Sequence, residues 1–170
     1  MRRTLVLAAA LVVLWSVVSQ ANHLLTPLRV YLFTGGLFVA YAALTQPLRP
    51  GLAASILGGL VCDAQAPAGL FGAHTLLFAA AHLGIFQVRD RIPRDDTASR
   101  VVVALLANFA LFLLLSFGQI RHSPAPAAAW PRLLADLLCS QVFLALISPW
   151  FFALQSRALV LTGVNREALS

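Results

Sequence analysis

The sequence predicts an all-α integral membrane protein built as a bundle of six transmembrane helices. Hydrophobic residues make up 60% of its 170 residues, charged residues make up only 11%, and the apolar residues gather in six segments with short connections. A soluble domain is about half apolar and about a quarter charged, so this chain has too few polar side chains to cover a surface in water. A soluble enzyme is therefore excluded, and residues 1–170 are expected to form one membrane domain.

Each apolar segment has to be a helix, because a backbone that crosses hydrocarbon must satisfy its own hydrogen bonds. Pro27, Pro50 and Pro131 stand where helices would begin, and there the missing N–H costs no hydrogen bond. The run Asp96–Ser99 offers capping side chains for the fifth helix. The six expected helices span about residues 4–19, 27–45, 50–66, 69–88, 98–120 and 131–155.

The first segment has two interpretations. Arg2 and Arg3 precede an apolar stretch that ends at Val18, and Ser19-Gln20-Ala21 has the small-x-small form of a signal-peptide cleavage site. We expect an uncleaved anchor, because the chain re-enters the membrane at once. Cleavage, which would leave five spans, is the alternative.

The third segment is short. Residues 50–66, at about 1.5 Å per residue, reach roughly 25 Å, whereas the hydrocarbon core of a bilayer is about 30 Å thick. This helix is therefore expected to stop short of the outer surface or to thin the bilayer locally.

The basic residues, all of them arginine, orient the bundle. With the N-terminus in the cytoplasm, the cytoplasmic side holds Arg2, Arg3, Arg49, Arg89, Arg91, Arg94, Arg100, Arg157 and Arg166. The outer side holds Arg29, Arg121 and Arg132. Cytoplasmic loops of membrane proteins are rich in basic residues, so both termini are expected in the cytoplasm. Topology thus accounts for the net charge of +6, and no nucleic-acid partner is expected.

Four polar residues are expected at one depth near the outer end of the bundle. Asp63 and His74 flank a tight hairpin, and Asp136 follows Arg132 by four positions, on the same helix face. Polar side chains inside a bilayer are costly, so each is a candidate functional residue. The cluster either binds a partner or solute, or consists of two local pairs, Asp63–His74 and Arg132–Asp136, that hold helices in register.

Small residues recur every four positions along the third segment. One face holds Gly51, Ser55 and Gly59, and the adjacent stripe holds Ala54, Gly58 and Cys62. Gly72, residues 79–81 and Gly84 do the same for the fourth segment. Such faces let helix backbones approach closely in membranes. They predict close packing within the bundle or a docking face for another protein's helix.

The chain holds no familiar catalytic motif and no metal-binding motif. His74 and His82 are eight positions apart, more than two helical turns, which suits a shared metal ion poorly. Asn108 and Gln141 lie at similar depths and are expected to hydrogen-bond to each other. The protein is therefore expected not to be an enzyme and to bind no cofactor or metal.

One region of the chain resembles a known family. Gly58-Gly59-Leu60-Val61-Cys62-Asp63 is followed by Gly69-Leu70-Phe71-Gly72-Ala73-His74-Thr75-Leu76. A short Gly-rich helix that ends in Asp, then a turn, then Leu-Gly and a helix of small residues, is similar to the signature region of the rod shape-determining protein MreD family. The matching positions are Gly59, Asp63, Gly69, Gly72 and His74. Elsewhere the agreement is in length and expected topology.

The resemblance implies a non-enzymatic scaffold of the bacterial cell-elongation complex in the cytoplasmic (inner) membrane. Its partner would be MreC-like, a single-span and largely periplasmic protein. MreB-type filaments and a glycan polymerase–transpeptidase pair would lie nearby, so that the scaffold helps to regulate peptidoglycan synthesis and cell shape. The same family resembles in fold the substrate-binding subunits of energy-coupling-factor vitamin transporters.

Two other functions are weighed against the scaffold. In a solute-binding transporter subunit, Asp63, His74 and Asp136 would face a pocket for a small, vitamin-like solute. A membrane enzyme would need the same three residues in a catalytic arrangement that the sequence does not reveal.

Overall fold

The computed structural model describes residues 2–64, 71–92, 96–120 and 126–161, and these ranges form helices and short connections without a β-strand. The all-α prediction is therefore confirmed. The α-helices of these ranges are α1 (Arg2–Leu25), α2 (Gly35–Thr45), α3 (Leu48–Asp63), α4 (Ala73–Val88), α5 (Thr97–Ile120) and α6 (Pro126–Leu161). Two 3-10 helices, η1 (Thr26–Leu28) and η3 (Arg89–Arg91), follow α1 and α4.

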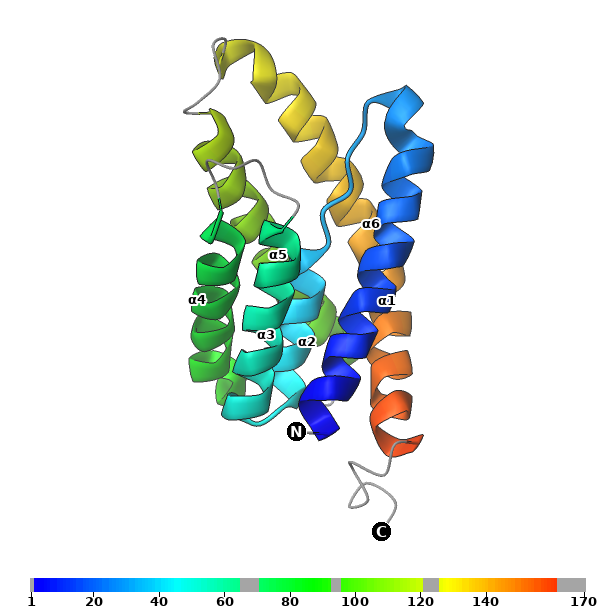
Figure 1. Cartoon of the computed structure of the whole chain (residues 1–170), viewed down its shortest axis with the longest axis vertical. Helices are drawn as coiled ribbons and strands as arrows, with labels where there is room; N and C mark the ends of the chain where they lie inside the picture. The colour runs from blue at the N-terminus through cyan, green and yellow to red at the C-terminus, as the bar shows by residue number, and fades with distance from the viewer. Residues whose placement is uncertain (1, 65–70, 93–95, 121–125, 162–170) are drawn as a thin grey trace.

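Helix α2 forms the centre of the bundle. It contacts α3, α4, α5 and α6, and residues 36–44 are all buried. Figure 1 shows α3 and α4 on one side of α2, and α1 and α6 on the other. The main hydrophobic cluster joins Leu7 of α1 and Tyr41 of α2 to Phe152 of α6. The Tyr41 and Phe152 rings meet edge to face at 5.5 Å.

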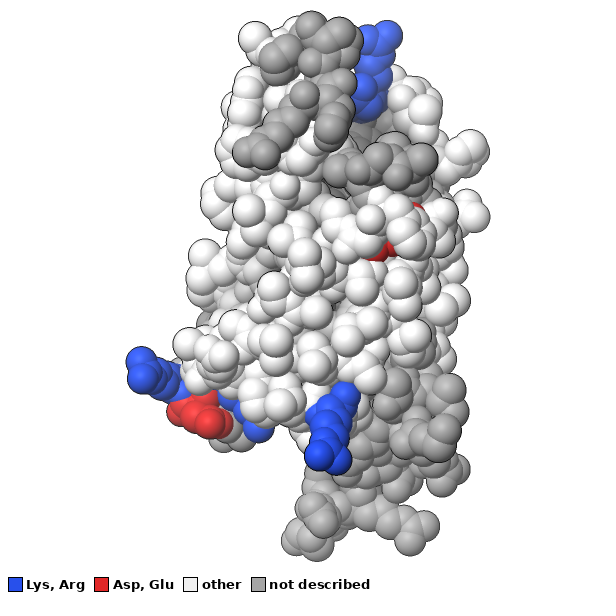
Figure 2. Space-filling model, turned by 60° about the vertical axis from the view of Figure 1, so that its left-hand side comes forward, with Lys and Arg blue, Asp and Glu red and all other residues white. Residues whose placement is uncertain are grey.

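Among the residues that the structure describes, three helical segments are long and apolar enough to cross a membrane, judged by length and composition: Ala9–Leu28, Thr97–Ile120 and Ala127–Leu161. Helix α2 is a shorter apolar helix, and α3 and α4 have 16 residues each, or about 24 Å. The predicted shortness of the third helix is thus confirmed. Figure 2 shows a broad, mostly uncharged band of surface between the arginines at its two ends, with a small carboxylate patch in its upper part. Large hydrophobic side chains such as Leu76, Leu106 and Leu146 are exposed. Such extended apolar surface is typical of a membrane protein and rare on soluble monomers.

The prediction of one continuous helix over residues 27–45 is wrong. Arg29 takes a left-handed conformation (φ 55°) after η1, and the chain then runs without helical structure to Thr34 before α2 begins. Tyr31 and Phe33 favour extended backbone. Polar side chains of neighbouring helices supply the hydrogen bonds that this stretch lacks, as described below.

Other helix boundaries differ from the expected ones by a few residues. Helix α6 begins at Pro126 rather than at Pro131, because the alanines at 127–129 are strong helix formers. Helix α1 extends to Leu25, α3 spans 48–63 instead of 50–66, and α4 begins at Ala73 instead of 69. Outside the described residues lie Gly69, Arg94, Arg121 and Arg166, and also the side chains of Arg2 and Arg3.

The small-residue face of α3 packs within the bundle. A Cβ on Gly59 would lie 2.4 Å from the Cα of Thr75 in α4, and one on Gly51 would lie 2.8 Å from the Ala42 carbonyl oxygen of α2. Ser55 is hydrogen-bonded to His82 of α4. The adjacent Gly58 faces α1 and α2 instead, where Leu11 and Phe38 are its nearest neighbours. The close-packing interpretation therefore describes this face, which α4 and α2 cover.

Asp96 caps α5, as the sequence predicts. Its Oδ2 accepts hydrogen bonds from the Ser99 hydroxyl at 2.7 Å and the Ser99 N–H at 3.0 Å, and its Oδ1 accepts one from the Ala98 N–H at 3.2 Å. The bond from the Ser99 hydroxyl, together with those from the two N–H groups, lowers the pKa of the Asp96 carboxyl.

The capping carboxylate should make stability depend on pH. Because its pKa is lowered in the folded state, its contribution is present above the unfolded pKa and is lost as the pH falls through the folded pKa. Between about pH 6 and about pH 2.5, we expect wild-type protein to lose more thermal stability than Asp96→Ala. Thermal unfolding in detergent at several pH values measures this. Equal losses would contradict the capping role, and Asp90→Ala, at a mostly exposed carboxylate, is the control.

Candidate functional site

The non-helical stretch before α2 is held by polar side chains from three helices. Asp136 Oδ1 accepts the Tyr31 N–H at 2.8 Å, and Ser140 Oγ accepts the Phe33 N–H at 3.0 Å, both from α6. Non-helical backbone at membrane depth is tolerated only where the protein itself satisfies it or where it lines a water-filled cavity. Asp136 and Ser140 of α6 therefore provide hydrogen-bond acceptors that the irregular backbone needs.

The amides of two asparagines complete this support. Asn22 of α1 makes two hydrogen bonds with the backbone of Leu32: Oδ1 accepts the N–H at 2.7 Å, and Nδ2 donates to the carbonyl at 3.0 Å. Asn108 of α5 is buried, and its Oδ1 accepts the Gly36 N–H at the start of α2, at 3.1 Å. Free N–H groups in the first turn of a helix need such acceptors.

Loss of the Asn22 amide should loosen the irregular stretch. Asn22→Leu removes two hydrogen bonds to backbone that is partly buried, and we expect it to lower the free energy of unfolding by roughly 2–3 kcal/mol. Denaturation in mixed detergent micelles, followed by circular dichroism, measures the change. Gln119→Leu, at an exposed side chain of α5, is the matched control. A loss no larger than that of the control would show that Asn22 does not support the stretch.

Asp63 joins the end of α3 to the start of α4. Its Oδ1 accepts the His74 N–H at 2.9 Å and lies 2.9 Å from His74 Nδ1. Its Oδ2 accepts the Thr75 N–H at 3.0 Å and the Thr75 hydroxyl at 2.6 Å. The predicted Asp63–His74 pair is confirmed. Thr75 was not predicted, although the N–H groups in the first turn of any helix lack acceptors within the helix.

Two other predicted pairs are wrong. Asp136 is bonded to the Tyr31 N–H, and no ion pair between Asp136 and the exposed Arg132 is present in the described ranges. Asn108 is bonded to Gly36 and not to Gln141, whose Nε2 donates instead to the Leu105 carbonyl at 3.2 Å. In both cases irregular or terminal backbone competes for the side chain and wins, because an unsatisfied buried N–H is costly.

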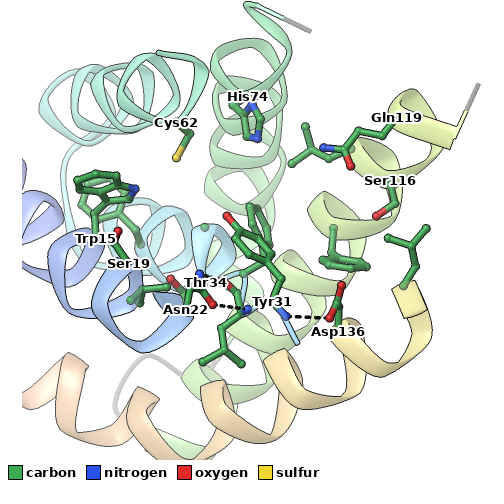
Figure 3. A pocket seen from close by; sticks show the side chains of 18 of the residues that line it. Trp15, Ser19, Asn22, Tyr31, Thr34, Cys62, His74, Ser116, Gln119 and Asp136 are labelled. Atoms are coloured by element: carbon green, nitrogen blue, oxygen red, sulfur yellow. Dashed lines mark hydrogen bonds between the residues drawn. The ribbon is translucent and has the colours of Figure 1, made fainter. Parts of the chain in front are cut away.

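A cavity of about 720 Å³ lies beside the non-helical stretch. Figure 3 shows His74 of α4, Asp136 of α6 and Gln119 of α5 around it, with Trp15 of α1 on the opposite side. Three of the four residues that the sequence placed at one depth, His74, Arg132 and Asp136, line the cavity, whereas Asp63 does not. Sequence reasoning missed the lining residues Trp15, Asn22, Tyr31, Ser116 and Gln119. The sequence signal for them was their polar or aromatic character within apolar segments or beside them.

The one serine–histidine contact among the described residues is enclosed. Ser55 Oγ lies 3.0 Å from His82 Nδ1, and both residues are 0% exposed. The His82 ring stacks on Phe86 at 6.2 Å, so no substrate reaches the pair. It packs α3 against α4, and it gives Ser55 the partner that sequence reasoning did not find.

No three His, Cys, Asp or Glu side chains of the described ranges gather closely enough to hold a metal ion. Cys62 and Cys139 are free. The cavity can therefore bind through hydrogen bonds, charge and aromatic contact. No family model, curated protein or solved structure matches this chain.

Proposed function

We propose that this chain is a non-enzymatic membrane scaffold of the bacterial cell-elongation complex, related to MreD and bound to an MreC-like partner. The observation that carries the proposal is the role of the motif residues. Gly59 lets α3 approach Thr75, and Asp63 binds His74 and Thr75. These motif residues thus hold α4 against α3, and a scaffold needs such a fixed pair of helices. MreB-type filaments and the glycan polymerase–transpeptidase pair would be reached through that complex.

The proposed topology has six spans in the cytoplasmic membrane, with both termini in the cytoplasm. Nine of the twelve arginines then lie on the cytoplasmic side. Helix α1 begins and α6 ends at the same end of the bundle (Figure 1), which agrees with an even number of crossings. Reporter fusions after residue 29 and after residue 170 should report opposite sides of the membrane.

The exposed face of α4 is where we place the partner's helix. Ala80 and Gly84 are exposed and four positions apart, and nothing lies within 4 Å of the Cβ position of Gly84. A foreign helix can approach closely at such a pair. The face of Gly51, Ser55 and Gly59 is covered by α4 and α2 and supports the hairpin instead.

Co-purification tests the scaffold. The tagged full-length chain should bring down an MreC-like protein from native membranes, and Gly84→Leu should weaken the association by roughly tenfold or more by blocking close approach. Ala110→Leu, which also enlarges an exposed small residue, is the matched control. Absence of an MreC-like protein, together with normal cell shape after deletion of the gene, would overturn the proposal.

The cavity favours a second candidate function, a solute-binding transporter subunit. Its volume of about 720 Å³ lies in the range of small-molecule sites, about 300–1,000 Å³. Asp63 lies outside the lining, so Asp136 is the residue to test. Saturable uptake that Asp136→Asn abolishes, with genes for an ATPase pair alongside, would favour this function over the scaffold.

A further inference from the structure

Two hydrogen-bond acceptors are directed into the cavity. Asp136 is 5% exposed, and one of its carboxylate oxygens is bonded to Tyr31. The other has no partner within the described ranges, and Figure 3 shows the side chain pointing toward the cavity. The Asp63 carboxylate takes the Nδ1 side of the His74 ring, so Nε2 is the ring nitrogen left for the cavity, and it accepts a hydrogen bond when the ring is neutral. The His74 ring also points into the cavity in Figure 3.

The surroundings of these acceptors suit a cation. The lining includes the aromatic rings of Trp15, Tyr31, Phe38, Phe78 and Phe112. The faces of such rings attract ammonium groups. A primary ammonium also carries three N–H donors, one of which can bind the free carboxylate oxygen of Asp136.

A guanidinium stands at the same cavity. Arg132 lines it, is exposed, and is not paired with Asp136 in the described part of the chain. Guanidinium groups bind phosphate and carboxylate through paired N–H donors. On α1, Leu11, Leu14 and Val18 give the lining an apolar strip beside the polar Ser19 and Asn22. The lining therefore offers three chemically distinct subsites.

We propose that this cavity binds a zwitterion in which a primary ammonium lies next to a phosphate. The ammonium binds Asp136, the phosphate binds Arg132, and any apolar chain lies against α1. This chemistry belongs both to an aminophospholipid of the surrounding membrane and to a soluble phosphoethanolamine-like solute. The assignment does not depend on whether the chain works as a scaffold or as a solute-binding subunit.

Trp15 provides the signal for a binding test. In the full-length Trp130→Phe/Trp150→Phe variant, Trp15 is the remaining tryptophan, and its fluorescence is followed during titration with short-chain lipids in mixed micelles. We expect phosphatidylethanolamine to bind roughly tenfold more tightly than phosphatidylcholine, whose methylated nitrogen has no N–H to donate. Equal affinities, or no saturable binding of either lipid, would overturn the proposal.

Variants separate the two charged contacts. Asp136→Asn keeps an acceptor for the Tyr31 N–H and should reduce the preference for phosphatidylethanolamine to less than about threefold. Arg132→Gln should weaken the binding of both lipids by a similar factor, roughly tenfold, because both lipids carry the phosphate. Asp90→Asn, at a mostly exposed carboxylate, is the control. If Asp136→Asn keeps the preference or Arg132→Gln keeps wild-type affinity, the corresponding contact is refuted.

Soluble phosphoethanolamine identifies the source of the ligand. If it displaces the lipid, the site recognises the zwitterion itself and a solute is sufficient. If it fails while phosphatidylethanolamine binds with the expected preference, the ligand is the membrane aminophospholipid. Both results support the proposed chemistry, and neither bears on binding to an MreC-like partner.

Discussion

Asp63→Ala should destabilise the protein by roughly 3–5 kcal/mol, the usual cost of removing one partner from a buried charged contact. The side chain is buried and accepts hydrogen bonds from the N–H groups of His74 and Thr75 and from the Thr75 hydroxyl. Alanine leaves these donors, which lie in the first turn of α4, without acceptors. The free energy of unfolding in mixed detergent micelles is the quantity to measure.

Two further variants make this result specific. Asp63→Asn keeps one carbonyl oxygen and should lose only about half as much stability, since it still accepts hydrogen bonds from part of the donor set. Asp90→Ala removes a carboxylate that is mostly exposed, and we expect a change within about 0.5 kcal/mol. If Asp63→Ala behaves like Asp90→Ala, the carboxylate does not hold the hairpin.

The sequence predicted those parts of the fold that local patterns determine. The apolar segments predicted the all-α class, and the shortness of the third segment predicted a short α3. The break before α2 was not predictable, because it depends on residues far away in the chain. Asp136 and Ser140 satisfy Tyr31 and Phe33 across more than a hundred positions. Residues 27–45 alone read as one apolar helix.

Only part of the candidate site was predicted, because the rest of it also depends on contacts between residues that are far apart in the chain. The Asp63–His74 contact follows from a hairpin, in which neighbours in sequence become neighbours in space. The expected Arg132–Asp136 pair relied on spacing along one helix, and such a pair is worth only about 0.2–0.5 kcal/mol when exposed. The Tyr31 N–H, at partly buried backbone, offers Asp136 a stronger competing hydrogen bond. Trp15 and Gln119 join the cavity only through the packing of α1 and α5.

Gly59→Ala should destabilise the protein by at least about 3 kcal/mol, at the upper end of the cost of overpacking. The added Cβ would lie 2.4 Å from the Thr75 Cα and 2.7 Å from the Thr75 nitrogen. Both are backbone atoms and cannot rotate away, so α3 and α4 must move apart. Gly84→Ala on α4 is the matched control. It meets nothing within 4 Å, and the higher helix propensity of alanine should stabilise the protein by about 0.5–1 kcal/mol.

The effects of Asp63→Ala and Gly59→Ala on the free energy of unfolding should also be coupled. Separating α3 from α4 at Thr75 lengthens the hydrogen bonds that Asp63 makes there, so Gly59→Ala already removes part of what Asp63→Ala removes. In a double-mutant cycle, the combined loss should fall short of the sum by about 0.5–3 kcal/mol, the range for residues in one contact network. Asp63→Ala with Gly84→Ala should be additive within about 0.5 kcal/mol. Additivity in the Gly59 cycle would mean that the close approach and the carboxylate stabilise the hairpin independently.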